Sequence, residues 1–282
     1  MKILITGASG FIGRHLAQFL GRKHFLLTPK SHELDLTSAA SVSAYLKYHP
    51  IDLVIHAASQ GVRITPDAPE AVADDNIAMF QNLAHVLPPN ARMISLGSGA
   101  EYDKCRDLNK ITEEKFGAQQ PADPYGYSKY IIACETEQSN NMVNLRIFGV
   151  YGPGENPTRF TSYAICQNLK RQPITINQNV VFDFIFIDDL VHIINFFVEN
   201  IPAHKAYNIT PTQSINLVDL AKIVNDISDF HSEITVAKPG LNYEYTGDNS
   251  RLLQEMGGFK FTAYPNGIKI LYDFLQPVCG SR

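Results

Sequence analysis

Residues 2–13 read KILITGASGFIG, an apolar run that enters a glycine-rich turn. The run itself suits a strand buried on both faces of a parallel sheet. Gly7, Gly10 and Gly13 then give the spacing GxxGxxG and lead directly into the helical pattern of Phe11–Leu20. In such a loop the glycines allow a tight turn, a close approach to a pyrophosphate and close packing of helix on strand. Because a helix N-terminus attracts anions, the stretch predicts a dinucleotide-binding strand-turn-helix unit.

Short apolar runs alternate with amphipathic stretches through the first half of the chain. This alternation predicts an α/β fold with a Rossmann-type, doubly wound parallel sheet. The expected strands are Ile3–Ile5, Phe25–Leu27, Leu53–Ile55, Met93–Leu96 and Leu145–Phe148, and the expected helices are Phe11–Leu20, Val42–Tyr48, Glu70–Leu87 and Tyr125–Glu137.

After Tyr151 the pattern loosens and glycine and proline mark loops. A smaller mixed C-terminal lobe is expected to close over the crevice at the carboxyl ends of the strands. Its division from the nucleotide-binding domain is predicted at residues 1–152 and about 180–206 for the domain, and about 153–179 and 207–282 for the lobe. The elements expected here are helices over Arg159–Leu169, Asp188–Val198 (capped by Asp188 or Asp189), Leu217–Ile227 and Pro265–Phe274, and one strand over Phe182–Ile187.

The chain has 282 residues, of which 45% are hydrophobic and 18% charged, with a formal net charge of −4. This composition is ordinary for a soluble globular protein, and it offers no basic excess for nucleic acid or an anionic membrane. No run approaches about 18 apolar residues, so we expect neither a membrane span nor a signal peptide. No CxxC pair or metal-ligand cluster occurs, which favours a cytoplasmic protein without a metal and with reduced thiols at Cys105, Cys134, Cys166 and Cys279.

The segment after the second expected strand carries a cation and no acid. Pro29-Lys30-Ser31 follows the strand end at Leu27-Thr28. An acid there would bind the ribose 2′-hydroxyl of NAD, whereas a cation accepts the 2′-phosphate of NADP. Lys30, with Arg14 just past the third glycine, therefore favours NADP(H) and leaves NAD(H) as the alternative; a merely solvated loop lysine is the competing interpretation of Lys30. Asp35 is expected after a short third strand, near the adenine.

Tyr125 and Lys129 stand four residues apart in PYGYSK and share one face of the expected helix. An ammonium beside a phenol favours the phenolate, so Lys129 is expected to lower the pKa of Tyr125. Such a tyrosine can exchange a proton with a sugar or alcohol oxygen. Ser98, at the end of the strand that leads into SGAEY, is expected to hydrogen-bond the same oxygen. Tyr127 is the competing phenol, but its spacing from Lys129 directs it elsewhere.

The order of glycine loop, strand-end serine and YxxxK resembles the extended short-chain dehydrogenase/reductases, the NAD(P)-dependent nucleotide-sugar epimerases, dehydratases and reductases. The similarity covers nearly the whole chain and includes LRIFGVYGP (145–153), DFIFIDD (183–189) and MGGF (256–259). Within the family, ELDL (33–36) and LGS (96–98) look closest to GDP-fucose synthase and the 4-keto-6-deoxy-sugar reductases. The resemblance implies that Tyr125 is the acid/base, that Lys129 lowers its pKa and holds the nicotinamide ribose, and that Ser98 polarises the carbonyl. It also implies a homodimer through the helices of Glu70–Leu87 and Tyr125–Glu137.

The resemblance extends both sites beyond these three catalytic residues. Substrate contacts are expected at Ser98, Gly99, Gly149, Arg159 and Arg251. Cofactor contacts are expected at Gly7, Ser9, Gly10, Phe11, Ile12, Gly13, Arg14, Lys30, Ser31, Asp35, Leu36, Ala57, Ala58, Ser59, Leu96, Tyr125, Lys129, Phe148 and Val150.

Departures from the family pattern indicate the branch. Dehydratases carry an Asp-Glu pair directly after the strand-end hydroxyl residue, where this chain has Gly99 and Ala100. GDP-fucose synthase epimerises with a cysteine at the second of these positions and a later histidine, and no histidine lies between Arg159 and Lys170. These absences favour NADPH-dependent reduction of a keto group on a nucleotide-linked sugar, expected to be a 4-keto-6-deoxy sugar. The alternatives are a 4-epimerase that retains NAD and a non-catalytic NADP(H)-sensing protein.

Two further departures concern the substrate. Phe182 replaces the family's usual arginine, which grips the diphosphate, and Gly149 replaces an asparagine. An apolar ring cannot pair with a diphosphate. Either the substrate lacks a diphosphate, or another cation takes the arginine's place; the candidates are Arg159, Lys170, Arg171 and Arg251.

Overall fold

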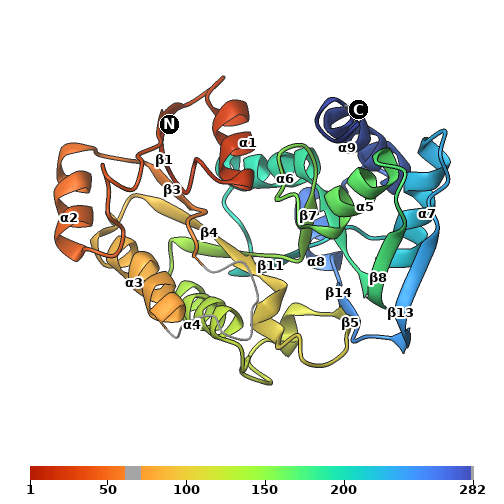
Figure 1. The fold of residues 1–282 in the computed structure, drawn as a ribbon. Coiled ribbons are helices and arrows are strands. Elements are labelled where there is room, and N and C mark those ends of the chain that lie inside the picture. Colours follow the sequence, from red (N-terminus) through yellow and green to blue (C-terminus); the bar gives the residue numbers. More distant parts are fainter. Residues whose placement is uncertain (61–70, 281–282) are drawn as a thin grey trace.

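A computed structural model describes residues 1–60 and 71–280, and a six-stranded parallel sheet forms its centre (Figure 1). The order across the sheet is β11-β6-β4-β3-β1-β2. The prediction of an α/β fold with a doubly wound sheet is confirmed. The strands are β1 (Lys2–Thr6), β2 (Phe25–Leu27), β3 (Leu53–His56), β4 (Arg92–Ser98), β6 (Met142–Ile147) and β11 (Ala206–Ile209).

Helices cover both faces of this sheet, and alternate residues of β1 show how. Ile3 and Ile5 pack in one core with α1 (Phe11–Leu20) and α6 (Ile187–Glu199). Leu4 points the other way, into a second core beneath α2 (Ala39–Tyr48), α3 (Ala71–Val86) and α4 (Pro124–Gln138). This alternation follows from the two-residue period of a strand, and it explains why the strands are apolar throughout.

The third strand expected before Asp35 is absent, which is a correction. Residues 31–36 form turns instead. The Asp35 carboxylate accepts hydrogen bonds from the backbone N–H and the hydroxyl of Thr37, and the Leu34 N–H bonds back to the Lys30 carbonyl. Such local bonds compete with sheet pairing. β2 pairs on one side of β1, and the next strand, β3, pairs on the other side. The strand order thus reverses at β1, and a crevice opens at the carboxyl ends of β1 and β3.

The remaining elements form smaller sheets and a helical cluster on the right of Figure 1. The predicted domain boundaries stay a proposal. β11 begins at the predicted boundary near residue 206 and lies in the main sheet, whereas β5, from the predicted nucleotide-binding domain, pairs with a strand of the lobe. The strands are β5 (Leu108–Ile111), β7 (Gly149–Tyr151), β8 (Ile174–Asn179), β9 (Val181–Phe182), β10 (Phe184–Phe186), β12 (Ile215–Asn216), β13 (Ile234–Leu241) and β14 (Tyr245–Gly247). The α-helices are α5 (Phe160–Leu169), α7 (Leu217–Ile227), α8 (Ser250–Met256) and α9 (Tyr264–Cys279); 3₁₀ turns occupy Gly99–Tyr102 and Glu113–Lys115.

The single strand expected over Phe182–Ile187 is wrong, because the chain breaks at Asp183. β9 joins the sheet of β12, β14 and β5, whereas β10 pairs with β7. The following helix also begins differently: its N-cap residue is Phe186, which makes no side-chain cap. Asp189, expected as a cap, instead accepts hydrogen bonds from the backbone N–H and hydroxyl of Thr262.

The expectation that all four thiols are reduced is also corrected. Cys166 on α5 and Cys279 at the end of α9 form a disulfide with Cα atoms 5.4 Å apart, and Cys105 and Cys134 are free. α5 and α9 pack directly on each other, which brings together two residues that are distant in the sequence. Within the described residues, the helices are too short or too polar to cross a membrane.

Candidate active site

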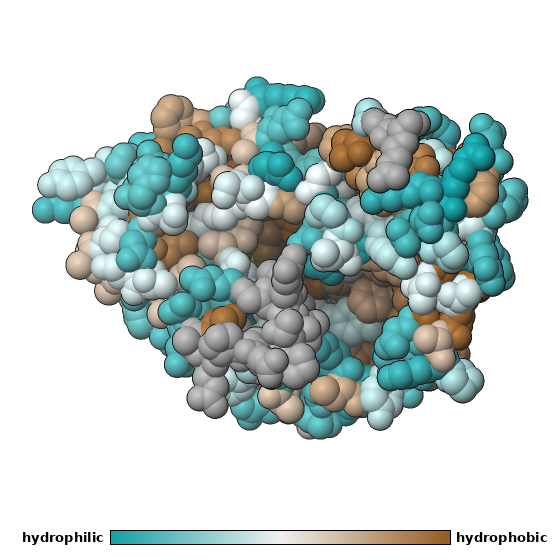
Figure 2. All heavy atoms as spheres, viewed as in Figure 1, coloured by the Kyte–Doolittle hydropathy of each residue, from teal (hydrophilic) through white to brown (hydrophobic). Residues whose placement is uncertain are grey.

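A cavity of about 610 Å³ lies at the carboxyl ends of β1, β2 and β3. The face of the molecule in Figure 2 is hollowed near its centre, between the surface over α2 and α3 and the surface over α5 and β8. Ten of the predicted cofactor residues line the cavity: Gly7, Ser9, Gly10, Lys30, Ser31, Asp35, Leu36, Ala57, Ala58 and Ser59. Sequence reasoning missed His32, Thr37, Gln60 and Met79, which also line it.

The glycine loop fits a pyrophosphate. Gly7 has φ +68°, and a Cβ there would lie 2.7 Å from the backbone nitrogen of Ala58, so only glycine is accommodated. Gly10 is the N-cap of α1 and brings no side-chain acceptor to the first N–H groups. These donors and the helix dipole are therefore available to an anion in the cavity. The arrangement of the residues suits a nicotinamide dinucleotide.

Other predicted cofactor residues do not line this cavity. Phe11, Ile12 and Gly13 form the first turn of α1. Arg14 is exposed and donates to the Gly154 carbonyl at 3.0 Å, which ties α1 to the loop after β7. Val150 lies in β7 against the main core.

Ser98, Tyr125 and Lys129 come together where β4 ends and α4 begins. Asp123 caps α4 by accepting from the Gly126 N–H, and this sets Tyr125 in the first turn. Lys129 is 4% exposed; its Nζ donates to the Leu96 carbonyl at 2.9 Å and lies 6.0 Å from the centroid of the Tyr125 ring. Ser98 is 8% exposed, and its hydroxyl reaches toward the Tyr125 phenol. The three predicted catalytic residues thus share one site.

The expected direction of the Tyr125 pKa shift is corrected. Burial raises the pKa of Tyr125, while the Ser98 hydroxyl and the Arg159 charge act to lower it. Burial also lowers the pKa of Lys129 to about 8, against the opposing charge of Glu101. Removing water disfavours phenolate and ammonium alike. In this structure Tyr125 is consequently a neutral proton donor.

The family model for the "NAD dependent epimerase/dehydratase family" matches residues 3–210. The chain belongs to the NAD-dependent epimerase/dehydratase family. GDP-L-colitose synthase from Yersinia pseudotuberculosis is 34% identical over 119 residues, 40% of this chain and 38% of that protein. GDP-6-deoxy-D-mannose reductase from Pseudomonas aeruginosa is 25% identical over 255 residues, 83% and 82% of the two chains. The solved GDP-mannoheptose C4 reductase of Campylobacter jejuni, with NADP bound, has a TM-score of 0.85 at 21% identity and covers 98% of each chain.

Membership of the epimerase/dehydratase family confirms the resemblance seen in the sequence. The protein is an NAD(P)-dependent enzyme of the extended short-chain dehydrogenase/reductase type. The structural likeness shows the same fold over 98% of the chain. Relatives of the family act on nucleotide-linked sugars, as their names state.

Aromatic side chains gather beside Gly99, next to Ser98. The Tyr245 ring lies 4.7 Å from Phe182 and 5.0 Å from Phe148, and Phe182 stacks on Phe184 at 4.7 Å. A Cβ at Gly149 would lie 2.9 Å from both Phe182 and Phe184. The two departures at positions 149 and 182 are therefore linked, because the rings occupy the space of a larger residue 149. Phe148, predicted as a cofactor contact, belongs to this aromatic group.

The predicted substrate cations lie in different places. Arg159 is exposed at the start of α5, and its charge acts on Tyr125. Arg251 instead pairs with Glu114 and donates to the Ala206 carbonyl, which ties α8 to the start of β11. Arg171 lies over the Phe230 ring.

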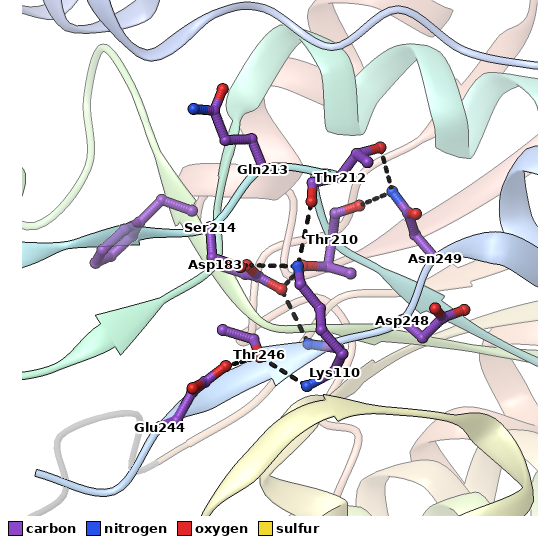
Figure 3. Close-up of polar contacts among 12 residues, drawn as sticks. Lys110, Asp183, Thr210, Thr212, Gln213, Ser214, Glu244, Thr246, Asp248 and Asn249 are labelled. Atoms are coloured by element: carbon purple, nitrogen blue, oxygen red, sulfur yellow. Dashed lines mark hydrogen bonds and ion pairs between the residues drawn. The ribbon is translucent and has the colours of Figure 1, made fainter.

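A buried carboxylate holds the aromatic strands in register. Asp183 is fully buried and accepts hydrogen bonds from the hydroxyls of Thr210 and Ser214 and from the Gly247 N–H. Figure 3 shows Lys110 reaching toward it from β5; Lys110 Nζ lies 3.5 Å from the carboxylate. Because Asp183 follows β9 and Gly247 ends β14, this hub fixes Phe182 relative to Tyr245.

His56, at the end of β3, gives the fold a dependence on acid pH. Burial lowers its pKa to about 3, and its Nδ1 lies 2.9 Å from the Thr6 hydroxyl. Between about pH 3 and 6.5 the unfolded chain binds a proton at His56 that the folded chain does not bind. The free energy of unfolding is therefore highest above about pH 6.5 and falls as the pH drops. We expect the free energy of unfolding to be about 2 kcal/mol lower at pH 5 than at pH 7 from this group alone.

Urea titrations at the two pH values measure this difference. In His56→Asn, which keeps a hydrogen-bonding group beside Thr6 but does not titrate, the difference should shrink by about the same 2 kcal/mol. His85→Asn, on α3, provides the matched control and should keep it. An unchanged pH dependence in His56→Asn would contradict the prediction.

Proposed function

We propose that this enzyme uses NADPH to reduce a keto group on a nucleotide-linked sugar. The observation that carries the proposal is the constellation of Ser98, Tyr125 and Lys129 at the end of β4, with no acid at positions 99 and 100. Gly99 and Ala100 are buried, and the neighbours of Gly99 are Tyr245 and Phe148. This environment supplies a proton donor for a developing alkoxide, and the nearby Glu101 carboxylate accepts from the Ser98 N–H and pairs with Arg146, so it is not free to remove a proton from carbon.

Ser98, Tyr125 and Lys129 each have a separate role in the proposed reduction. When bound, the cofactor supplies a hydride to the carbonyl carbon. Ser98 donates a hydrogen bond to the carbonyl oxygen, and Tyr125 transfers its proton to that oxygen as negative charge develops there. Lys129, with a pKa of about 8, is mostly protonated at neutral pH and stabilises the phenolate left on Tyr125. Solvent then returns the proton to Tyr125.

The aromatic group beside Ser98 supports a 6-deoxy sugar as the substrate. Phe148, Phe182 and Tyr245 lie on the lobe side of Ser98, next to the position proposed for the carbonyl. A methyl group packs favourably against such rings, whereas a hydroxymethyl group would lose hydrogen bonds to water there. Arg159 is the cation that we propose for the diphosphate.

The cofactor loop supports NADPH over NADH. Lys30, Ser31 and His32 line the cavity beyond the end of β2, and Lys30 is exposed. We expect purified protein to release little nicotinamide nucleotide on denaturation and to bind NADPH at least about tenfold more tightly than NADH, because one charge contact to a phosphate is worth on the order of 1.5–3 kcal/mol. Fluorescence titration measures both affinities.

Lys30→Ala should remove most of this preference by weakening NADPH binding while leaving NADH binding unchanged. Lys47→Ala, an exposed lysine on α2, is the matched control. Stoichiometric NAD retained through purification would overturn the reductase and favour the 4-epimerase. Binding of NADPH without turnover of any keto sugar would favour the non-catalytic sensor.

We further propose a cytoplasmic homodimer that pairs through α3 and α4. These helices pack against each other on one side of the sheet and are joined by Gln81 and Glu135, whose side chains lie 2.6 Å apart. Sedimentation should give about twice the chain mass of 31.4 kDa, and the monomer mass would refute the dimer.

A further inference from the structure

A phenol from the C-terminal lobe lies beside Ser98, in space that residue 99 leaves free. A Cβ built on Gly99 would lie 2.6 Å from Tyr245 Oη and 2.8 Å from the Phe148 ring. A side chain at position 99 therefore does not fit while Tyr245 is in place. The group next to the strand-end serine comes from β14 and not from the loop after β4.

Packing fixes the position of this phenol. Tyr245 is 9% exposed, and its ring lies between Phe182 at 4.7 Å and Phe148 at 5.0 Å. The strand that carries it is held at Gly247, whose N–H donates to the buried Asp183 carboxylate at 2.9 Å. A side chain restrained by rings on two sides holds its hydroxyl in one place.

The Ser98 hydroxyl has one proton to donate and two lone pairs that accept. The Ala100 N–H donates to Ser98 Oγ at 3.1 Å and occupies one lone pair. The hydroxyl also lies within reach of two phenols, Tyr125 and Tyr245, and the Tyr245 oxygen lies 2.6 Å from a Cβ built on the neighbouring Gly99. When Tyr245 donates to the second lone pair, the only proton of Ser98 is directed to the Tyr125 side, where the keto oxygen is proposed to lie.

We propose that Tyr245 is a positioning residue that donates to Ser98 Oγ and directs the Ser98 proton to the reacting oxygen. The kinetic consequence rests on the proposed ketone reduction. The contact between the Tyr245 and Ser98 hydroxyls does not depend on that reduction. The kinetic consequence and the contact are therefore tested by separate experiments.

The kinetic arm uses Tyr245→Phe, which keeps the ring and removes the hydroxyl. With NADPH and a GDP-linked 4-keto-6-deoxy sugar, kcat should fall about tenfold, while KM and the NADPH Kd stay within about twofold. Tyr243→Phe removes an exposed phenol two residues away and should change nothing. In the Ser98→Ala background, adding Tyr245→Phe should change kcat by less than about twofold, because the two residues act through one hydrogen bond.

The structural arm needs no substrate. Crystal structures of the wild type and Tyr245→Phe should show Ser98 in one rotamer in the first and in more than one in the second. An unchanged Ser98 rotamer, or a full tenfold loss that persists in the Ser98→Ala background, would overturn the positioning role. If the wild type turns over no keto sugar, the proposed function fails, and the Ser98 rotamer still decides the role of Tyr245.

Discussion

Tyr125→Phe is expected to lower kcat for ketone reduction by about a thousandfold, within the range that a lost general acid costs. The variant keeps the ring, so packing at the start of α4 is preserved. It removes the proton that the phenol would donate to the alkoxide. Lys129, whose Nζ lies 6.0 Å from the ring centroid, cannot transfer a proton to the alkoxide by way of a hydroxyl that is no longer there. Stopped assays of the keto sugar with NADPH measure the loss.

The NADPH affinity of Tyr125→Phe should stay within about threefold of the wild type, because the hydroxyl acts in the chemical step and not in binding the cofactor. Tyr127→Phe, two residues further along the same helix, is the matched control and should keep more than half of the activity. Near-normal turnover in Tyr125→Phe would show that another group delivers the proton.

Arg146→Leu is expected to destabilise the fold by about 3–5 kcal/mol, because it leaves the buried Glu101 carboxylate without its charged partner. Arg146 and Glu101 are both fully buried, and Arg146 Nε lies 2.7 Å from Glu101. Burial raises the pKa of Glu101, and the guanidinium of Arg146 acts in the opposite direction. Glu101 also accepts from the Ser98 N–H, so the ion pair supports the turn that carries the catalytic serine.

Thermal unfolding should show a drop in Tm of about 10 °C in Arg146→Leu, given the usual scaling for a chain of this size. The double variant Glu101→Leu/Arg146→Leu should recover part of the loss, because it buries no unpaired charge. Lys222→Leu removes an ion pair to Asp219 in which both side chains are more than half exposed, and it should shift stability by less than about 0.5 kcal/mol. Equal losses in the buried and the exposed pair would contradict this account.

Local sequence signals predicted the parts of the site that local structure builds. The glycine loop, Ser98 and the pair of Tyr125 and Lys129 each lie at a strand end or helix start, where spacing alone indicates geometry. The direction of the Tyr125 pKa could not be foreseen, because it depends on how deeply the packed chain removes the phenol from water. The sequence shows Lys129 nearby but not the burial that raises the pKa of Tyr125.

Contacts between segments that are distant in the sequence could not be predicted from local sequence patterns. Tyr245 reaches Ser98 only because β14 pairs with β5 and β9, and β14 is too short for a clear period. The break at Asp183 follows from a carboxylate whose hydrogen-bond partners, Thr210, Ser214 and Gly247 among them, are distant in the sequence. The Cys166–Cys279 bond likewise depends on the packing of α5 on α9. In each case tertiary structure decides what local propensity leaves open.

The most direct test of the proposed reduction follows hydrogen from cofactor to sugar. Wild-type enzyme is incubated with NADPH carrying deuterium at C4 of the nicotinamide and with a GDP-linked 4-keto-6-deoxy sugar, and the product is analysed by mass spectrometry and NMR. We predict one NADPH oxidised per sugar reduced and deuterium on the carbon that held the keto group. An epimerised sugar without net consumption of NADPH would contradict the account and identify an epimerase.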